Sequence, residues 1–153
     1  MAKQQITIPV FVPEEACPHR CIYCNQFSIT GKPGIPSERE ITDTIDQYCS
    51  TISPETRVEL GFFGGSFTGI PLEAMTRLLD IIQPYLRDKV ISSIRISTRP
   101  DYITEPILHL LREKGVGTIE LGVQSMDQQV LKLANRGHSV DDTIHAVVAA
   151  TDR

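Results

Sequence analysis

The chain alternates short apolar segments, rich in β-branched and aromatic residues, with longer stretches of helical periodicity, and this alternation constrains its fold most. We predict strands at residues 6–12, 57–63, 91–98 and 117–123. A helical segment with apolar residues at three- and four-residue spacing follows each of them. Strands joined by single helices run parallel through right-handed crossovers. The sequence therefore predicts an α/β fold with one parallel sheet and about four β-α units.

Several local signals refine this pattern. Ser37 and Glu40 form an S-x-x-E capping box that opens the first helix. Pro9 cannot donate a ladder hydrogen bond, so the first strand is expected at a sheet edge. Pro84 is expected to kink or end the second helix early. We expect the last helix, opened by Ser139 and Asp142, to turn its apolar residues inward, namely Ile144, Val147 and Val148.

Composition limits the class of protein. The 153 residues are enough for one domain, and 41% hydrophobic with 22% charged residues is ordinary for a soluble globular protein. The apolar runs are strand-sized, so no segment is expected to cross a membrane. A net charge of −4 argues against a large nucleic-acid footprint. The first residues lack the layout of a signal peptide, which predicts a reducing, cytoplasmic location.

Three cysteines, Cys17, Cys21 and Cys24, follow the first strand with the spacing C-x3-C-x2-C. Three thiolates do not fill a tetrahedral zinc site, whereas a four-iron cubane on three thiolates keeps one iron open for a small molecule. A zinc site with His19 as the fourth ligand is the alternative. Cys49 lies on the first predicted helix, and we interpret it as a small core residue.

Chemically unusual residues follow each predicted strand. The cysteines come after the first strand, Gly64 and Gly65 after the second, Ser97 and Thr98 end the third, and Gln124 follows the fourth. Ligands bind beyond the carboxyl ends of parallel strands. The sequence therefore predicts that these segments meet in one site, although Gly-Gly alone is also typical of a plain tight turn.

The cysteine spacing, with the aromatic Tyr23 just before the third cysteine, resembles the signature of the radical S-adenosylmethionine (SAM) superfamily. The segments 62–67, 97–102 and 120–126 are similar to the radical SAM domain of the Elongator catalytic-subunit family. Gln124-Ser125 followed by residues 135–138 also resembles oxygen-independent coproporphyrinogen III oxidases. The resemblance implies a partial TIM-type barrel of six β-α units. Residues 1–153 are then expected to form a radical SAM core domain that is truncated on its C-terminal side.

The resemblance also implies roles for individual residues. Cys17, Cys21 and Cys24 would bind three irons of a 4Fe-4S cluster, and SAM would chelate the fourth iron. Tyr23 would lie near the adenine. The backbone of Gly64 and Gly65 would meet the SAM amino group, because glycine lets the backbone approach closely. Ser66, the next residue, is also expected to bind the cofactor.

The resemblance implies cofactor contacts at three further positions. Gln124 and Arg136 would contact SAM, with Arg136 pairing with its carboxylate. Their alternatives are a surface glutamine and a helix-terminal arginine. Ser97 stands where relatives often have a glutamate, so that contact is either weakened or supplied elsewhere. His138 and His19 could move protons, but histidines near loops are usually exposed bystanders, and we expect that of both.

The implied activity is reductive cleavage of SAM to a 5′-deoxyadenosyl radical that abstracts hydrogen from an unknown substrate. An electron donor such as flavodoxin or ferredoxin would reduce the cluster, and the subfamilies suggest a tRNA or a tetrapyrrole-like substrate. The alternative is a protein that does not cleave SAM, either an iron–sulfur protein serving electron transfer or structure, or a zinc-binding protein.

Overall fold

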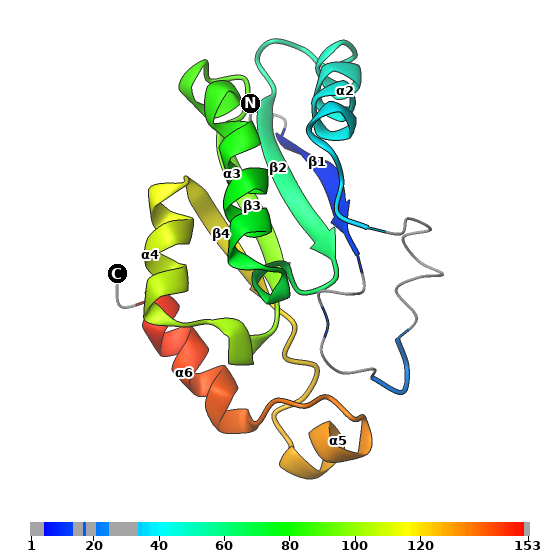
Figure 1. Ribbon diagram of the computed structural model, residues 1–153, viewed down its shortest axis with the longest axis vertical. Coiled ribbons are helices and arrows are strands. Elements are labelled where there is room, and N and C mark those ends of the chain that lie inside the picture. The colour runs from blue at the N-terminus through cyan, green and yellow to red at the C-terminus, as the bar shows by residue number, and fades with distance from the viewer. Residues whose placement is uncertain (1–4, 14–16, 18–20, 25–33, 152–153) are drawn as a thin grey trace.

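The computed structural model describes residues 5–13, 17, 21–24 and 34–151, and its strands form one parallel sheet. The strands are β1 (Gln5–Val12), β2 (Arg57–Gly64), β3 (Ser93–Thr98) and β4 (Val116–Leu121). They lie in the order β1-β2-β3-β4, and each neighbouring pair is parallel (Figure 1). The predicted α/β class and the chain order of its strands are confirmed.

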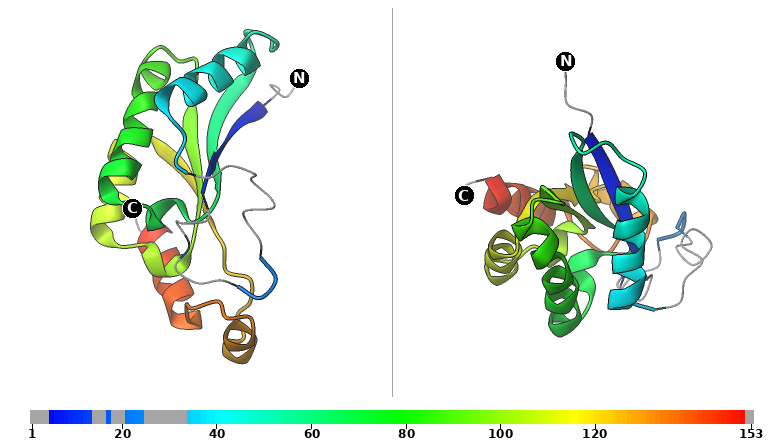
Figure 2. Two further views of the ribbon diagram at one scale, coloured as in Figure 1. Left: turned by 45° about the vertical axis from the view of Figure 1, so that its right-hand side comes forward. Right: turned by 90° about the horizontal axis from the view of Figure 1, so that it is seen from above.

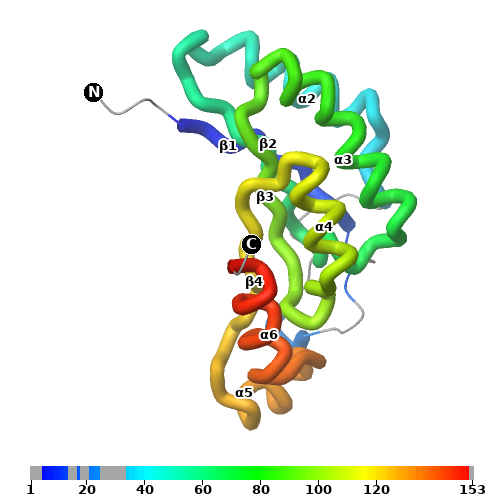
Figure 3. The backbone as a smooth tube through the Cα atoms, turned by 90° about the vertical axis from the view of Figure 1, so that its left-hand side faces the viewer, coloured from blue at the N-terminus to red at the C-terminus, as the bar shows by residue number. Residues whose placement is uncertain are grey.

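The helices lie on one side of this sheet and at its carboxyl end. Those on the side are α2 (Glu38–Cys49), α3 (Leu72–Arg87) and α4 (Glu105–Glu113), which cover the same face in both views of Figure 2. Near the end toward which the strands run lie α5 (Gln128–Leu133) and α6 (Val140–Thr151) (Figure 3). The single-turn helices η2 (Phe67–Gly69) and η3 (Pro100–Tyr102) follow β2 and β3.

The two faces of the sheet differ in polarity because successive side chains alternate between them. The face under the helices is apolar, and its fully buried side chains include Ile8, Leu60, Phe62, Ile94 and Ile96. Phe62 stacks on Phe67 of η2 with ring centroids 4.6 Å apart, which fixes η2 against the end of β2. This core holds rigid the strand ends from which the functional loops start.

The other face of the sheet carries a ladder of charged residues. Arg95 of β3 donates from Nε to Glu59 of β2 at 2.7 Å and from Nη1 to Glu120 of β4 at 2.6 Å. Glu59 is buried, and its carboxylate also accepts a hydrogen bond from the hydroxyl of Ser93 at 3.1 Å. The ladder ends at Glu120, near the carboxyl end of the sheet.

Two local predictions are confirmed, whereas the predicted early end of α3 at Pro84 is wrong, and so is the predicted inward face of α6. Ser37 and Glu40 form the complete capping box of α2, and Pro9 lies on the edge strand β1. However, α3 continues past Pro84 to Arg87, because Pro84 lies in its last turn and Tyr85 and Leu86 still pack on the core. The apolar residues of α6 that we expected inside are about half exposed, namely Ile144, Val147 and Val148.

The reason for the second error lies in how α6 packs. Its buried residues are Thr143 and Ala146, which are small and let α6 approach η3 closely. The sequence pattern favoured the larger apolar side chains, but the geometry of the close contact selects the small ones. Among the described residues no helix is long and apolar enough to cross a membrane. His19 lies outside the described ranges.

Candidate functional site

A cavity of about 360 Å³ lies beyond the carboxyl ends of the strands, where the four loops meet. The residues that the sequence predicts to bind a metal or a cofactor all line it, namely Cys17, Cys21, Tyr23, Cys24, Gly64, Gly65, Ser66, Ser97, Gln124 and Arg136. They come from the carboxyl ends of β2 and β3, from the loops after β1, β2 and β4, and from the segment between α5 and α6. The structure thus brings together segments that are up to 119 positions apart in the sequence, from Cys17 to Arg136.

The three cysteines differ in their surroundings. Cys21 is buried, whereas Cys17 and Cys24 are half-buried, and all three are free thiols. Burial raises the pKa of the Cys17 thiol, and a backbone hydrogen bond at Ser66 together with the charges of Arg99 and Arg136 partly opposes that rise. In the described part of the chain no three Cys, His, Asp or Glu side chains are arranged to hold a metal ion. The donor set nonetheless fits an iron–sulfur cluster, since three thiols face one cavity.

Hydroxyl groups join the loops after β2 and β3 below this cavity. Thr98 Oγ1 lies 2.8 Å from Ser66 Oγ and 2.5 Å from Thr68 Oγ1. The backbone N–H of Arg99 donates to Ser66 Oγ at 3.2 Å. All these groups are buried, so the hydrogen bonds fix one loop to the other. The wall that contains Gly64 and Gly65 is therefore rigidly attached to the sheet.

Backbone conformation at the cavity is unusual at two positions. Gly64 has φ +100°, which only glycine adopts readily, and the N–H of Gly65 donates to the Val12 carbonyl at 3.2 Å. Gln124 has φ +68°, a left-handed conformation that is uncommon for a residue with a side chain. Strained residues of this kind gather at ligand sites, where the surrounding structure over-determines them.

Ser97, which stands where relatives often have a glutamate, pairs with Glu120 on the neighbouring strand. Ser97 Oγ donates to Glu120 Oε2 at 2.9 Å, and Arg95 holds the other carboxylate oxygen. Both Ser97 and Glu120 line the cavity. A carboxylate therefore reaches this part of the wall from β4 and not from position 97 on β3.

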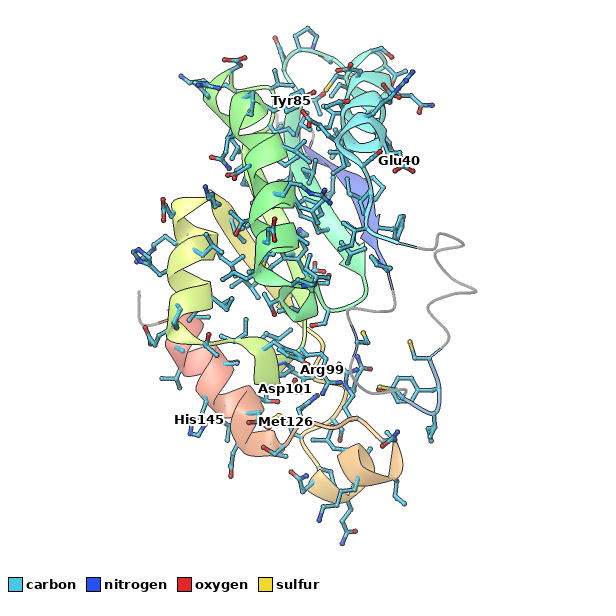
Figure 4. All side chains as sticks on the ribbon, viewed as in Figure 1. Glu40, Tyr85, Arg99, Asp101, Met126 and His145 are labelled. Atoms are coloured by element: carbon cyan, nitrogen blue, oxygen red, sulfur yellow. The ribbon has the colours of Figure 1, made fainter. Side chains whose placement is uncertain are left out.

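Arg99 and Arg136 form another part of the cavity wall. Arg99 is 2% exposed, and its guanidinium binds the Asp101 carboxylate through two hydrogen bonds of 3.0 and 2.9 Å. Its Nη1 also donates to the main-chain carbonyl of Arg136 at 2.6 Å. Figure 4 shows Arg99 and Asp101 side by side near the carboxyl end of the sheet. This partly buried ion pair therefore anchors the segment that carries Arg136.

Five further lining residues had no role assigned from the sequence, namely Thr98, Arg99, Glu120, Leu121 and Gly122, although Thr98 was expected at this edge of the sheet. Thr98 and Arg99 stand within a segment already singled out, so their position directly after a strand was the available signal. Glu120 pairs with Ser97 across the β3–β4 register. A bulge between Ile94 and Arg95 sets this register, and nothing in the sequence reports it.

His138 is not the exposed bystander that we expected. It is 3% exposed, and both of its ring nitrogens are buried. Burial lowers the pKa of His138, and the charges of Arg136 and Arg99 lower it further. The imidazole is therefore held neutral in the folded protein at neutral pH.

This shift makes stability depend on pH. An unfolded histidine titrates at about 6.5, so below that pH the unfolded state gains a proton that folded His138 still resists. We expect the free energy of unfolding to fall as the pH drops from about 6.5 through the lowered pKa. Urea unfolding of His138→Gln should show a weaker dependence across this range. His145→Gln, at an exposed position, should keep the original slope, and equal slopes in all three proteins would contradict the assignment.

Comparisons with known proteins agree with this geometry. The family model described as "Radical SAM superfamily" matches residues 12–153. A tRNA uridine(34) acetyltransferase from Methanocaldococcus infernus is 27% identical over 183 residues, covering 95% of this chain and 34% of the relative. A heme chaperone, HemW, from Bacillus subtilis is 28% identical over 133 residues, covering 82% of this chain and 34% of the relative.

A solved structure shares the fold. The archaeal Elp3 of Methanocaldococcus infernus superposes with a TM-score of 0.64 at 24% identity, over 95% of this chain and 35% of that one. The parallel sheet with its helices therefore corresponds to part of a radical SAM partial barrel. The chain spans about a third of the length of these relatives.

Proposed function

Because this chain belongs to the radical SAM superfamily, we propose that its cavity holds a 4Fe-4S cluster on Cys17, Cys21 and Cys24 with SAM beside it. The observation that carries this proposal is that the three thiols line one cavity together with Gly64 and Gly65. The thiols are the ligands that such clusters use. Residues 1–153 would then act as a radical SAM core domain, in the cytoplasm.

The chemistry of the donor set supports a cluster with one open iron. Apart from the thiols, Glu120 is the one acidic or imidazole side chain among the described residues of the cavity wall, and Arg95 and Ser97 already hold it. Three thiolates with no fourth protein ligand keep one position for a small molecule. When bound together, cluster and SAM supply a 5′-deoxyadenosyl radical that removes hydrogen from a substrate.

The residues of the wall would bind and orient SAM. The rigid turn at Gly64, Gly65 and Ser66 presents backbone groups without side chains in the way. Gln124 and Arg136 approach from the other side, and Tyr23 lies between the second and third cysteines. Glu120 adds a carboxylate, which would accept hydrogen bonds from hydroxyl or ammonium groups of the ligand.

The substrate class follows only from the relatives. A tRNA uridine(34) acetyltransferase supports a tRNA substrate, and a heme chaperone supports a tetrapyrrole ligand. The heme chaperone also favours a second candidate, in which the domain holds its cluster and does not cleave SAM. An electron donor such as flavodoxin or ferredoxin would serve the first candidate.

Anaerobic reconstitution distinguishes the two candidates. We expect the chain to bind about four irons and, with SAM and dithionite, to release 5′-deoxyadenosine, measured by chromatography with mass spectrometry. The Cys21→Ala variant, treated in the same way, is the control and should release none. Iron binding without 5′-deoxyadenosine would favour the second candidate. A protein that binds zinc and no iron would overturn both.

A further inference from the structure

Arg136 contacts a proposed cluster ligand directly. Its Nη1 donates a hydrogen bond to the sulfur of Cys21 at 3.3 Å, across 115 positions of sequence. The resemblance to relatives assigned this guanidinium to the carboxylate of SAM, and it did not predict a contact with a thiol. Cys21 is also the most buried of the three cysteines, so water competes little for this hydrogen bond.

Two other contacts fix the guanidinium beside Cys21. Its Nη2 donates to the main-chain carbonyl of Gly122, directly after β4. A Cβ at Gly122 would lie 2.8 Å from Nη2, so glycine is the residue that leaves room for this approach. The main chain of Arg136 is held in turn by Arg99, which the Asp101 carboxylate keeps in place.

The loop that carries Cys21 is also attached to the segment before Arg136. The N–H of Ile22 donates to the carbonyl of Ala134, at the end of α5, at 3.2 Å. The sulfur of Cys21 and the guanidinium of Arg136 are therefore positioned by a backbone hydrogen bond between their own segments. The contact does not depend on the side chains alone.

From this arrangement we propose that Arg136 raises the reduction potential of the cluster by donating an N–H to the ligating sulfur of Cys21. The inference rests on the proposed function. Reduction by an external one-electron donor adds one negative charge to the cluster and its thiolates. A hydrogen bond to sulfur and a nearby positive charge both stabilise that reduced state. Arg136 is a positioning and tuning residue in this role, distinct from a contact with SAM.

Arg136 also lines the cavity, so the predicted contact of its guanidinium with SAM remains available in addition. Potentials must therefore be measured without SAM, so that a lost SAM contact does not enter the comparison. The two roles are then separable, because only the effect on the potential persists in the absence of the cofactor.

The test is a redox titration with dithionite, followed by electron paramagnetic resonance, on the anaerobically reconstituted chain. Arg136→Gln removes the charge and the fork of donors, and we expect its cluster to have a more negative midpoint potential. A tenfold harder reduction corresponds to about 59 mV for one electron. Arg136→Lys keeps the positive charge but loses the planar set of guanidinium donors. Its midpoint potential should lie between those of the wild type and Arg136→Gln. Lys132→Gln removes an exposed charge on α5 and should match the wild type.

Gly122→Ala provides an independent variant, because its methyl group displaces the guanidinium while Arg136 remains. We expect a shift in the same direction as for Arg136→Gln. Wild-type potentials in both Arg136→Gln and Gly122→Ala would overturn the inference. Failure of Arg136→Gln, Arg136→Lys and Gly122→Ala to hold a cluster would also overturn it, since a residue that only tunes the potential is dispensable for cluster assembly. If the wild type itself binds no iron, the proposed function fails instead.

Discussion

Replacing Cys17, Cys21 or Cys24 by alanine is expected to abolish the bound iron–sulfur cluster. A cubane on three thiolates has a single iron without a protein ligand, and loss of one thiolate leaves two irons without one. The described surroundings offer no substitute, because the acidic group on the cavity wall, Glu120, is held by Arg95 and Ser97. We expect iron content to fall from about four per chain to near zero.

Cys49→Ala is the matched control for this experiment. Cys49 ends α2 and packs partly against the apolar core, on the helical side of the sheet. Burial raises the pKa of its thiol, with a smaller contribution from the charge of Asp46, so the thiolate form is disfavoured there. Iron assay and the visible absorption spectrum should match the wild type. Loss of the cluster in Cys49→Ala as complete as in Cys21→Ala would show that the ligand assignment is wrong.

The fold was predictable where the sequence pattern has a local cause. Helix initiation at Ser37 depends on hydrogen bonds within three residues, so the capping box was visible before the structure. The edge position of β1 follows from the missing N–H of Pro9 alone. The alternation of strands and helices was enough to predict parallel strands, because chain connectivity restricts the alternatives.

Predictions failed where tertiary packing decides. Pro84 removes one hydrogen bond of α3, but contacts of Tyr85 and Leu86 with the core keep the last turn helical. The buried face of α6 is set by its close approach to η3, which selects Thr143 and Ala146 over the larger apolar residues. Periodicity alone does not tell which of two helix faces will meet a neighbour.

The candidate site was also predictable where a local sequence pattern decides, and not where tertiary packing decides. Residues placed directly after strands, such as Gly65 and Gln124, were found because parallel strands end at one edge. Glu120 was missed because its meeting with Ser97 depends on the strand register. The contact between Arg136 and Cys21 was missed for a similar reason, since it requires Cys21 and Ile22 to lie against the segment at the end of α5. Sequence spacing indicates chemistry, and register and loop packing decide which groups touch.

A second large effect is expected at the glycine turn after β2. Gly65 is buried, lines the cavity and is tied to β1 through the Val12 carbonyl. Valine at this position would place three carbon atoms where the backbone must approach SAM, so we expect affinity for SAM to fall at least about tenfold, or about 1.4 kcal/mol. Iron content should stay near that of the wild type, because the thiols are untouched. Equilibrium dialysis with labelled SAM measures the first quantity, and an iron assay measures the second.

The choice of Gly65 over Gly64 keeps this experiment interpretable. Gly64 has φ +100°, so any side chain there strains the backbone and would lower stability as well as binding. Gly65 does not share that conformation. The loss of affinity for SAM should therefore grow with side-chain size, from Gly65→Ala to Gly65→Val. Thermal unfolding of both variants checks that the fold is retained. Wild-type affinity for SAM in folded Gly65→Val would place the cofactor elsewhere, because no ligand lying on this turn could tolerate the added side chain.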